Sequence, residues 1–221
     1  MELRALMSSD VALCPLGPVG GRHRVWLWSA LVAAVVVGLT IDEPVMAAAR
    51  PLYHSDTAEL VNNTIRYLGT GYLQVPLALL MLAAGAVYGP RVRVAGAWTL
   101  AAFLASGLVA HVLKLFIHRA RPYVSGPAPE QWIGYVGNSD FASFPSAEAA
   151  TSFAVAVTLA AWYPRVRLPV IILALLVSLA RVPVGAHHPS DIAAGALLGV
   201  AIAQCLISVA TCRARNHAAA S

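Results

Sequence analysis

Residues 94–117 read VAGAWTLAAFLASGLVAHVLKLFI, a run of 24 residues whose one charged side chain is Lys114. As an α-helix this run would extend about 36 Å, which exceeds the roughly 30 Å of hydrocarbon in a bilayer. Inside lipid every backbone N–H and C=O must be paired within the protein, so a spanning segment is a helix or a strand of a closed barrel. The run lacks the alternation of apolar and polar residues that a barrel strand shows. It therefore predicts a transmembrane helix.

Comparable apolar runs on both sides of this segment predict further transmembrane helices. The chain of 221 residues is 59% hydrophobic and 11% charged, far from the composition of an average soluble protein. We expect an all-α polytopic membrane protein with six transmembrane helices in one bundle over residues 25–212. Residues 1–24 are expected to be a flexible cytoplasmic tail and residues 213–221 a second cytoplasmic tail. The expected spans lie near residues 25–41, 71–89, 94–117, 147–163, 168–182 and 190–211.

Lysines and arginines are distributed unevenly between the two ends of the expected bundle. The side that holds both termini has nine of them, and the opposite side has six. Because positive loops are retained in the cytoplasm, both termini are expected there. The Ala- and Val-rich composition is typical of a bacterial protein, and we interpret the membrane as a bacterial inner membrane. The net charge of +5 resides in these loops and forms no basic stripe with interleaved aromatic residues. Nucleic acid is therefore not an expected partner.

Two cations near the end of the third apolar run, Lys114 and Arg121, are seven residues apart. If the helix continues to the residue before Pro122, both side chains lie on one face, where they repel unless an anion sits between them. A guanidinium group suits two phosphate oxygens at once. The alternative for this pair is that both side chains extend towards the membrane interface.

The sequence Ser143-Phe-Pro-Ser-Ala-Glu148 directly precedes the fourth apolar run. Proline and serine at this position mark the start of a helix, with Ser146 as its N-cap. A helix N-terminus offers free N–H groups and the positive end of the helix dipole, both of which favour a phosphate. Considered alone, Ser146 could be a simple cap and Glu148 an ordinary residue of the first turn.

Residues 181–191 read RVPVGAHHPSD and precede the last apolar run. Pro189 suits the first position of a helix, which would place Asp191 in its first turn, within reach of His187. A carboxylate bonded to one imidazole nitrogen fixes the tautomer and leaves the other nitrogen free to attack. A metal site formed by His187, His188 and Asp191 is the alternative, but the sequence offers no further cluster of metal ligands.

These three segments resemble the motifs of the type 2 phosphatidic acid phosphatase superfamily of membrane lipid phosphatases. The first family motif, a lysine followed by six residues and Arg-Pro, is matched by residues 114–122. The second motif, Pro-Ser-Gly-His, corresponds to residues 145–148, which read Pro-Ser-Ala-Glu. The third motif is Ser-Arg, five residues, His, three residues and Asp, and it corresponds to residues 180–191. The six-span layout, with all motifs on one side, also resembles the membrane branch of this family.

The resemblance implies a role for each matched residue. His187 would attack phosphorus and become phosphohistidine, while Asp191 would orient it. The phosphate oxygens would be held by Lys114, Arg121, Arg181, Ser146 and the N–H of Ala147. Because these cations and N–H donors stabilise the charge of the transferring phosphoryl group, no metal and no other cofactor is expected.

The chain departs from the family pattern at two informative positions. Ala180 replaces a serine, which removes about one hydrogen bond near the phosphate. Glu148 replaces the histidine that is thought to protonate the leaving group and later activate water. A carboxyl group can do both if it is protonated when the substrate is bound: burial and a bound dianion favour the protonated form, whereas nearby cations favour the carboxylate. Glu148 is therefore expected to serve as acid and base.

The expected function is removal of a phosphate from a lipid phosphate or diphosphate at the periplasmic face. Candidate substrates are phosphatidic acid, phosphatidylglycerophosphate, undecaprenyl diphosphate and lipid A, and the sequence does not choose among them. A phosphotransferase that passes the phosphoryl group to another lipid would use the same phosphohistidine. A non-catalytic lipid-phosphate binder or transporter is the alternative from another class, although pure anion binding has no use for Asp191 beside the site.

Overall fold

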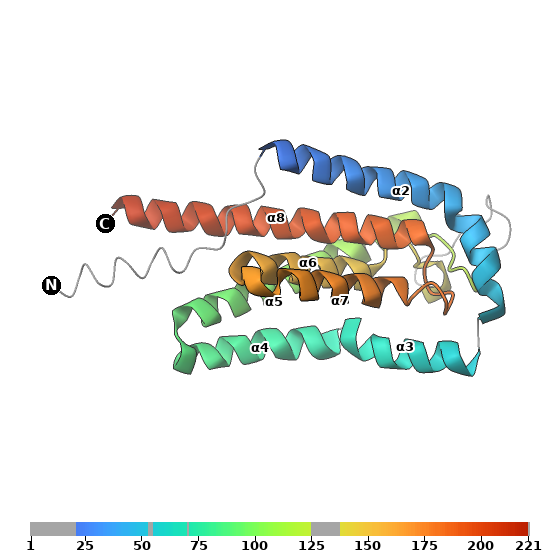
Figure 1. Ribbon diagram of the computed structural model, residues 1–221, viewed down its shortest axis with the longest axis horizontal. Helices are drawn as coiled ribbons and strands as arrows, with labels where there is room; N and C mark the ends of the chain where they lie inside the picture. The colour runs from blue at the N-terminus through green and yellow to red at the C-terminus, as the bar shows by residue number, and fades with distance from the viewer. Residues whose placement is uncertain (1–20, 53–54, 70, 125–137, 221) are drawn as a thin grey trace.

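The computed structural model describes residues 21–52, 55–69, 71–124 and 138–220, and these residues are almost entirely helical (Figure 1). The expectation of an all-α membrane protein is confirmed, and each of the six expected spans coincides with a helix. Of the expected tail at residues 1–24, residues 1–20 lie outside the described residues, and residues 21–24 already belong to the first helix. The helices are α2 (Gly21–Ala49), α3 (Asp56–Gly69), α4 (Gly71–Tyr88), α5 (Pro90–Ile117), α6 (Ala147–Trp162), α7 (Arg167–Leu179) and α8 (Pro189–Ala220), with short 3₁₀ turns at Arg50–Leu52, Ser139–Phe141 and Pro164–Val166.

Four helices of the described chain are long and apolar enough to cross a membrane: α2, α4, α5 and α8. Helix α6 is apolar but shorter, with 16 residues, and α7 has 13. The start of α2, the turn between α4 and α5, the α6–α7 connection and the end of α8 all lie at one end of the bundle (Figure 1). The last helix continues beyond the expected end of the span, so residues 213–220 of the expected tail are helical.

Helix α3 is the one helix of the described residues that the apolar runs did not predict. It reads DTAELVNNTIRYLG, and its first turn carries Asp56 and Glu59. Polar residues interrupt its apolar positions, so it contains no apolar run of spanning length. The preceding helix α2 contains Pro44 and bends towards α3 at its end (Figure 1). A proline within a helix removes one backbone hydrogen bond, which accounts for such a bend.

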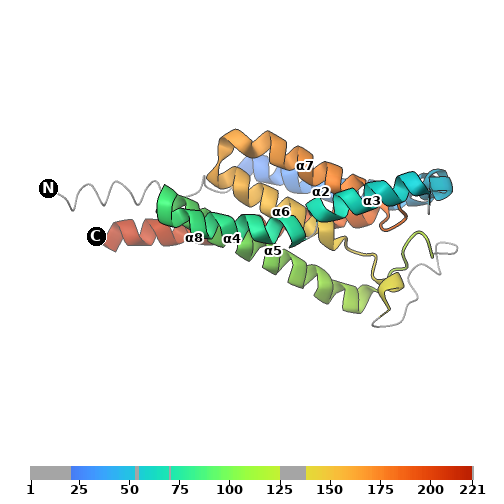
Figure 2. The same ribbon diagram turned by 90° about the horizontal axis from the view of Figure 1, so that it is seen from below.

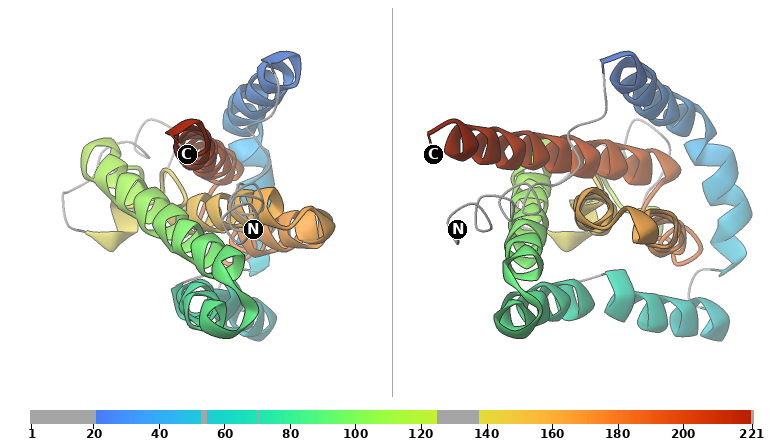
Figure 3. Two further views of the ribbon diagram at one scale, coloured as in Figure 1. Left: turned by 90° about the vertical axis from the view of Figure 1, so that its left-hand side faces the viewer. Right: turned by 60° about the vertical axis from the view of Figure 1, so that its left-hand side comes forward.

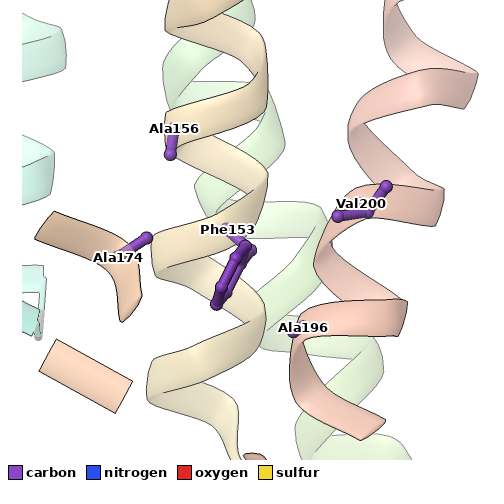
Figure 4. Close-up of a cluster of buried hydrophobic side chains, with 5 residues drawn as sticks. All are labelled: Phe153, Ala156, Ala174, Ala196 and Val200. Atoms are coloured by element: carbon purple, nitrogen blue, oxygen red, sulfur yellow. The ribbon is translucent and has the colours of Figure 1, made fainter. Parts of the chain in front are cut away.

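Helix α6 is the central helix of the bundle. It is enclosed by α5, α7 and α8 (Figure 3), and eleven of its sixteen residues are buried. Phe153 and Ala156 of α6 pack against Ala174 of α7 and against Ala196 and Val200 of α8 (Figure 4). Because neighbouring helices cover α6 on most sides, its length does not have to match the bilayer.

Helices α6 and α8 pack so closely that their backbones are in contact. A Cβ atom added at Gly195 would lie 2.4 Å from the carbonyl oxygen of Ser146, and one added at Gly199 would lie 2.2 Å from that of Ala150. The two glycines are four residues apart and therefore lie on one face of α8. Small residues at this spacing allow transmembrane helices to pack closely. This packing holds the N-terminus of α6 beside the start of α8.

Replacing Gly199 with alanine is expected to destabilise the protein by about 2 kcal/mol, because the added methyl group meets backbone that can move only if the helices separate. For a chain of this size the melting temperature in detergent should fall by roughly 4 to 8 °C. Gly107→Ala is the matched control, since its Cβ would meet only the Thr151 methyl group at 3.4 Å. Equal melting temperatures for the two variants would contradict the close packing of α6 and α8.

Candidate active site

The side chains of the three sequence motifs lie at the end of the bundle opposite to the start of α2 and the end of α8. Figure 2 shows α5 crossing the bundle obliquely, with its end close to the 3₁₀ turn at Ser139–Phe141. The start of α6, the segment after α7 and the start of α8 complete this region. The three motif segments, which are far apart in the chain, are therefore brought together.

Helix α8 begins at Pro189 and carries Asp191 in its first turn, as expected. The Asp191 side chain is fully buried. Its Oδ2 atom accepts hydrogen bonds from the backbone N–H of His188 at 2.8 Å and from the Ser143 hydroxyl at 2.5 Å. Its Oδ1 atom accepts a hydrogen bond from the guanidinium group of Arg119 at 2.7 Å. Such a buried carboxylate is tolerated because both of its oxygens are bonded.

His187 lies between two carboxylates. Its Nε2 atom is 3.0 Å from Oε2 of Glu148, while its Nδ1 atom is 3.8 Å from Oδ2 of Asp191, which is beyond hydrogen-bond distance. Within the described part of the chain, the buried Nδ1 atom has no hydrogen-bond partner. The ring nitrogen that contacts Asp191 is Nδ1 of His188, at 3.2 Å. Asp191 is thus beside His187, but its hydrogen bonds go to the neighbouring residues.

Glu148 connects His187 to the third motif's arginine. It lies in the first turn of α6, and its Oε1 atom is 3.4 Å from the guanidinium group of Arg181. Arg181 follows α7 in a turn, and its side chain is largely buried. The Glu148 carboxyl group therefore sits between the imidazole and a cation, where a substrate phosphate would also be attracted.

Ser146 is the N-cap of α6, as expected. Its hydroxyl accepts a hydrogen bond from the N–H of Ala149 at 3.3 Å, and its own N–H donates to the carbonyl oxygen of Asp191 at 3.0 Å. Ala147 is the first residue of the helix. The positive end of the α6 dipole is thereby directed at the region occupied by His187 and Glu148.

Helix α5 ends at Ile117, where the expected span also ended, and it does not continue to the residue before Pro122. His118 adopts a left-handed conformation with φ 49°, which terminates the helix before Arg121. The condition under which Lys114 and Arg121 would share one helical face is therefore not met. Both cations nevertheless donate hydrogen bonds to the segment between α5 and α6. Lys114 donates to the carbonyl oxygens of Ala142 and Ser143. Arg121 donates to the carbonyl oxygen of Ser139, and also to that of Ala186.

The turn that Arg121 binds is also held by Tyr123, whose hydroxyl donates to Oδ1 of Asp140 at 2.7 Å. Partial burial and this hydrogen bond raise the pKa of the Tyr123 phenol, so it remains protonated as a donor. The N–H of Arg121 donates to the carbonyl oxygen of Asp140 at 2.7 Å. The 3₁₀ turn at Ser139–Phe141, which directly precedes the residues that Lys114 contacts, is thus held against the segment that follows α5.

Four residues of the site were not singled out from the sequence: Asp42, Arg119, Ser143 and His188 as a partner of Asp191. Arg119 forms ion pairs with Asp42 and Asp191 at 2.7 Å each. The sequence signal for Asp42 is an acidic residue at the end of an apolar run, because a carboxylate at membrane depth needs a partner. Within the described ranges no group of three His, Cys, Asp or Glu side chains is arranged to hold a metal ion.

The helical membrane domain and the buried cluster of histidine, carboxylates and cations are the features expected of a membrane phosphatase that acts on lipid phosphates. The chain belongs to the PAP2 superfamily, whose family model matches residues 95–214. The resemblance inferred from the three motifs is thereby confirmed.

Curated relatives and a solved structure agree with this assignment. The chain is 32% identical over 202 residues to a lipid A 1-phosphatase of Rhizobium johnstonii, with 86% of this chain and 80% of the relative covered. It is 29% identical over 191 residues to a lipid A 1-phosphatase of Rhizobium etli, covering 80% and 81%. The crystal structure of a transmembrane PAP2 type phosphatidylglycerolphosphate phosphatase from Bacillus subtilis is similar with a TM-score of 0.61 and 25% identity, covering 82% of this chain and 91% of that one. This chain is accordingly a membrane lipid phosphatase.

Proposed function

We propose that this enzyme removes phosphate from a lipid through a phosphohistidine formed on Nε2 of His187. The observation that carries the proposal is the position of this atom, 3.0 Å from the Glu148 carboxyl group, which is itself 3.4 Å from the Arg181 guanidinium. A nucleophile, a proton donor and a phosphate-binding cation thus lie in consecutive contact. Lys114, which donates to the carbonyl oxygen of Ala142, and the N-terminus of α6, whose first turn carries Glu148, add further positive charge to this region.

One proton between His187 and Glu148 is sufficient for the first step. When it resides on Glu148, the imidazole nitrogen is free to attack and the carboxylic acid is ready to donate. Nε2 then forms a bond to phosphorus, the bond from phosphorus to the lipid oxygen breaks, and the Glu148 proton goes to that oxygen. In the second step water loses a proton to Glu148 and displaces the imidazole, which releases inorganic phosphate and restores both residues.

Lipid A carrying a phosphate at its sugar position 1 is the first candidate substrate, because the two curated relatives are lipid A 1-phosphatases. A phosphate on an anomeric carbon has a more acidic leaving oxygen than one on a simple alcohol. Its departure requires less protonation, which suits a carboxyl group held among cations as the acid. A lipid diphosphate has the same advantage, since its leaving group is a phosphomonoester.

The proposal includes an orientation in which six helices cross the inner membrane, both termini are cytoplasmic and the site faces the periplasm. The end of the bundle opposite to the site carries the connections with Arg91, Arg93, Arg165 and Arg167. Arginines near the ends of spans are retained on the cytoplasmic side. The positive charges of the site are bonded within it and are retained for the chemistry.

Purified protein in detergent is expected to release inorganic phosphate from lipid A faster than from phosphatidylglycerophosphate or phosphatidic acid, with glycerol 3-phosphate as the soluble control. Transfer of phosphate to an added lipid acceptor would instead indicate a phosphotransferase. In sealed vesicles, a short-chain lipid phosphate that cannot cross the bilayer should be hydrolysed by right-side-out vesicles and not by inverted ones. No release from any of these lipids, or release by inverted vesicles alone, would overturn the respective part of the proposal.

A further inference from the structure

Arg119 is a buried cation that the proposed reaction does not use. It lies beyond the end of α5, and its side chain is 2% exposed. One of its terminal nitrogens is 2.7 Å from Oδ2 of Asp42, and the other is 2.7 Å from Oδ1 of Asp191 and 2.6 Å from the Ser190 hydroxyl. A single guanidinium group therefore binds one carboxylate from α2 and one from α8. Its planar fork is suited to bridging two acceptors in a fixed geometry.

Asp42 connects α2 to the first turn of α8. It is buried, and its carboxylate also accepts hydrogen bonds from the backbone N–H of Ser190 at 3.0 Å and from the Ser190 hydroxyl. One turn earlier in α2, a Cβ atom added at Gly38 would lie 2.8 Å from the Cα atom of Ser190. The backbones of the two helices are thus in direct contact where Asp42 binds. A lone carboxylate at this depth would be costly, so its pairing with Arg119 is required.

The ion pair with Arg119 sets the orientation of the Asp191 carboxylate together with the hydrogen bonds that Oδ2 accepts from Ser143 and from the N–H of His188. Because Oδ1 is held by the guanidinium group, Oδ2 is the oxygen directed at the imidazoles, 3.2 Å from His188 and 3.8 Å from His187. Without the cation, the carboxylates of Asp42 and Asp191 would face each other without compensation. Asp191 would then rotate or gain a proton, and either change would remove its charge from beside His187.

We propose that Arg119 and Asp42 are positioning residues, which hold Asp191 ionised and correctly turned beside the nucleophile. This inference rests on the proposed function, since it concerns the same reaction. Neither residue is among the groups proposed to bind the phosphate, and the terminal nitrogens of Arg119 are bonded to Asp42, Ser190 and Asp191, so loss of Arg119 or Asp42 affects turnover more than substrate binding. The inference also gives α2, which contributes none of the three motifs, a role in catalysis.

The test compares Arg119→Gln, Asp42→Asn and the double variant Asp42→Asn/Arg119→Gln, with all rates expressed per folded molecule after size exclusion. Glu43→Gln is the matched control, because Glu43 is the exposed neighbour of Asp42 on the same helix. Arg119→Gln is expected to lower kcat by about 100-fold, the cost of a small misplacement of catalytic groups, while KM changes by less than about threefold. The kcat of the double variant should be at least about tenfold higher than that of Arg119→Gln, because Asp191 then no longer lies near a second, unpaired carboxylate. Glu43→Gln should behave as the wild type.

A purely structural pair would lower the melting temperature and the yield but leave kcat per folded molecule unchanged, and that result would overturn the inference. A double variant no more active than Arg119→Gln would also overturn it. If Arg119→Gln does not fold, Asp42→Asn decides: a lower kcat than that of Glu43→Gln at equal KM supports the inference, and equal kcat values contradict it. Failure of the proposed function is distinguishable, because the wild type itself would then release no phosphate.

Discussion

Replacing His187 with asparagine is expected to lower kcat by roughly 10⁴-fold or more, because removal of a catalytic nucleophile leaves only binding and electrostatic stabilisation. The His187 side chain is 1% exposed, and its Nε2 atom is 3.0 Å from Oε2 of Glu148. Asparagine is smaller and polar, and the fold should tolerate it. Phosphate release from the preferred lipid substrate measures the effect.

His188→Asn is the control for this prediction, since His188 is equally buried and adjacent. Its ring nitrogen contacts Asp191 at 3.2 Å, so a smaller loss, within about tenfold, is expected. Reaction with radiolabelled substrate, followed by quenching in alkaline detergent and peptide mapping, should place the label on His187. Label on His188, or turnover of His187→Asn within tenfold of the wild type, would refute the assignment of the nucleophile.

Replacing Glu148 with glutamine is expected to lower kcat by about 10² to 10⁴-fold, the usual contribution of a general acid and base. Glutamine keeps the size of the side chain and can still donate a hydrogen bond, but it cannot transfer a proton. Because the negative charge 3.4 Å from Arg181 is removed, this cation becomes more available to phosphate and KM should decrease. A decrease in both kcat and KM would distinguish a general acid and base from a residue that only binds the substrate.

The leaving group provides a further check on Glu148. The loss in Glu148→Gln should be larger for phosphatidic acid, whose leaving oxygen is a simple alkoxide, than for a lipid diphosphate, whose leaving group needs little protonation. Glu148→His restores the residue of the family motif and should retain substantial turnover. Equal losses for both substrates, or unchanged turnover in Glu148→Gln, would exclude the role of Glu148 as the proton donor.

Much of the fold could be predicted because the membrane restricts what an apolar run can become. The run at residues 94–117 was expected to be a helix, and the structure has helix α5 at Pro90–Ile117. Helix α3 was not expected, because Asp56 and Glu59 interrupt its apolar positions. The sequence left open a continuation of this helix to the residue before Pro122, and the left-handed His118 ends it earlier. Termination by a left-handed residue other than glycine has only a weak sequence signal.

The sequence by itself determined the helical membrane fold and the order of the residues that define a phosphatase, because backbone pairing in lipid and the chemistry of phosphate transfer each allow few solutions. Only the tertiary structure decided which atoms meet. It placed the Glu148 carboxyl group within hydrogen-bond distance of Nε2 of His187, and it turned Asp191 towards His188. It also paired Arg119 with Asp42, 77 residues away. The packing of α2, α6 and α8 sets these contacts, and no periodicity along the chain encodes contacts between residues so far apart.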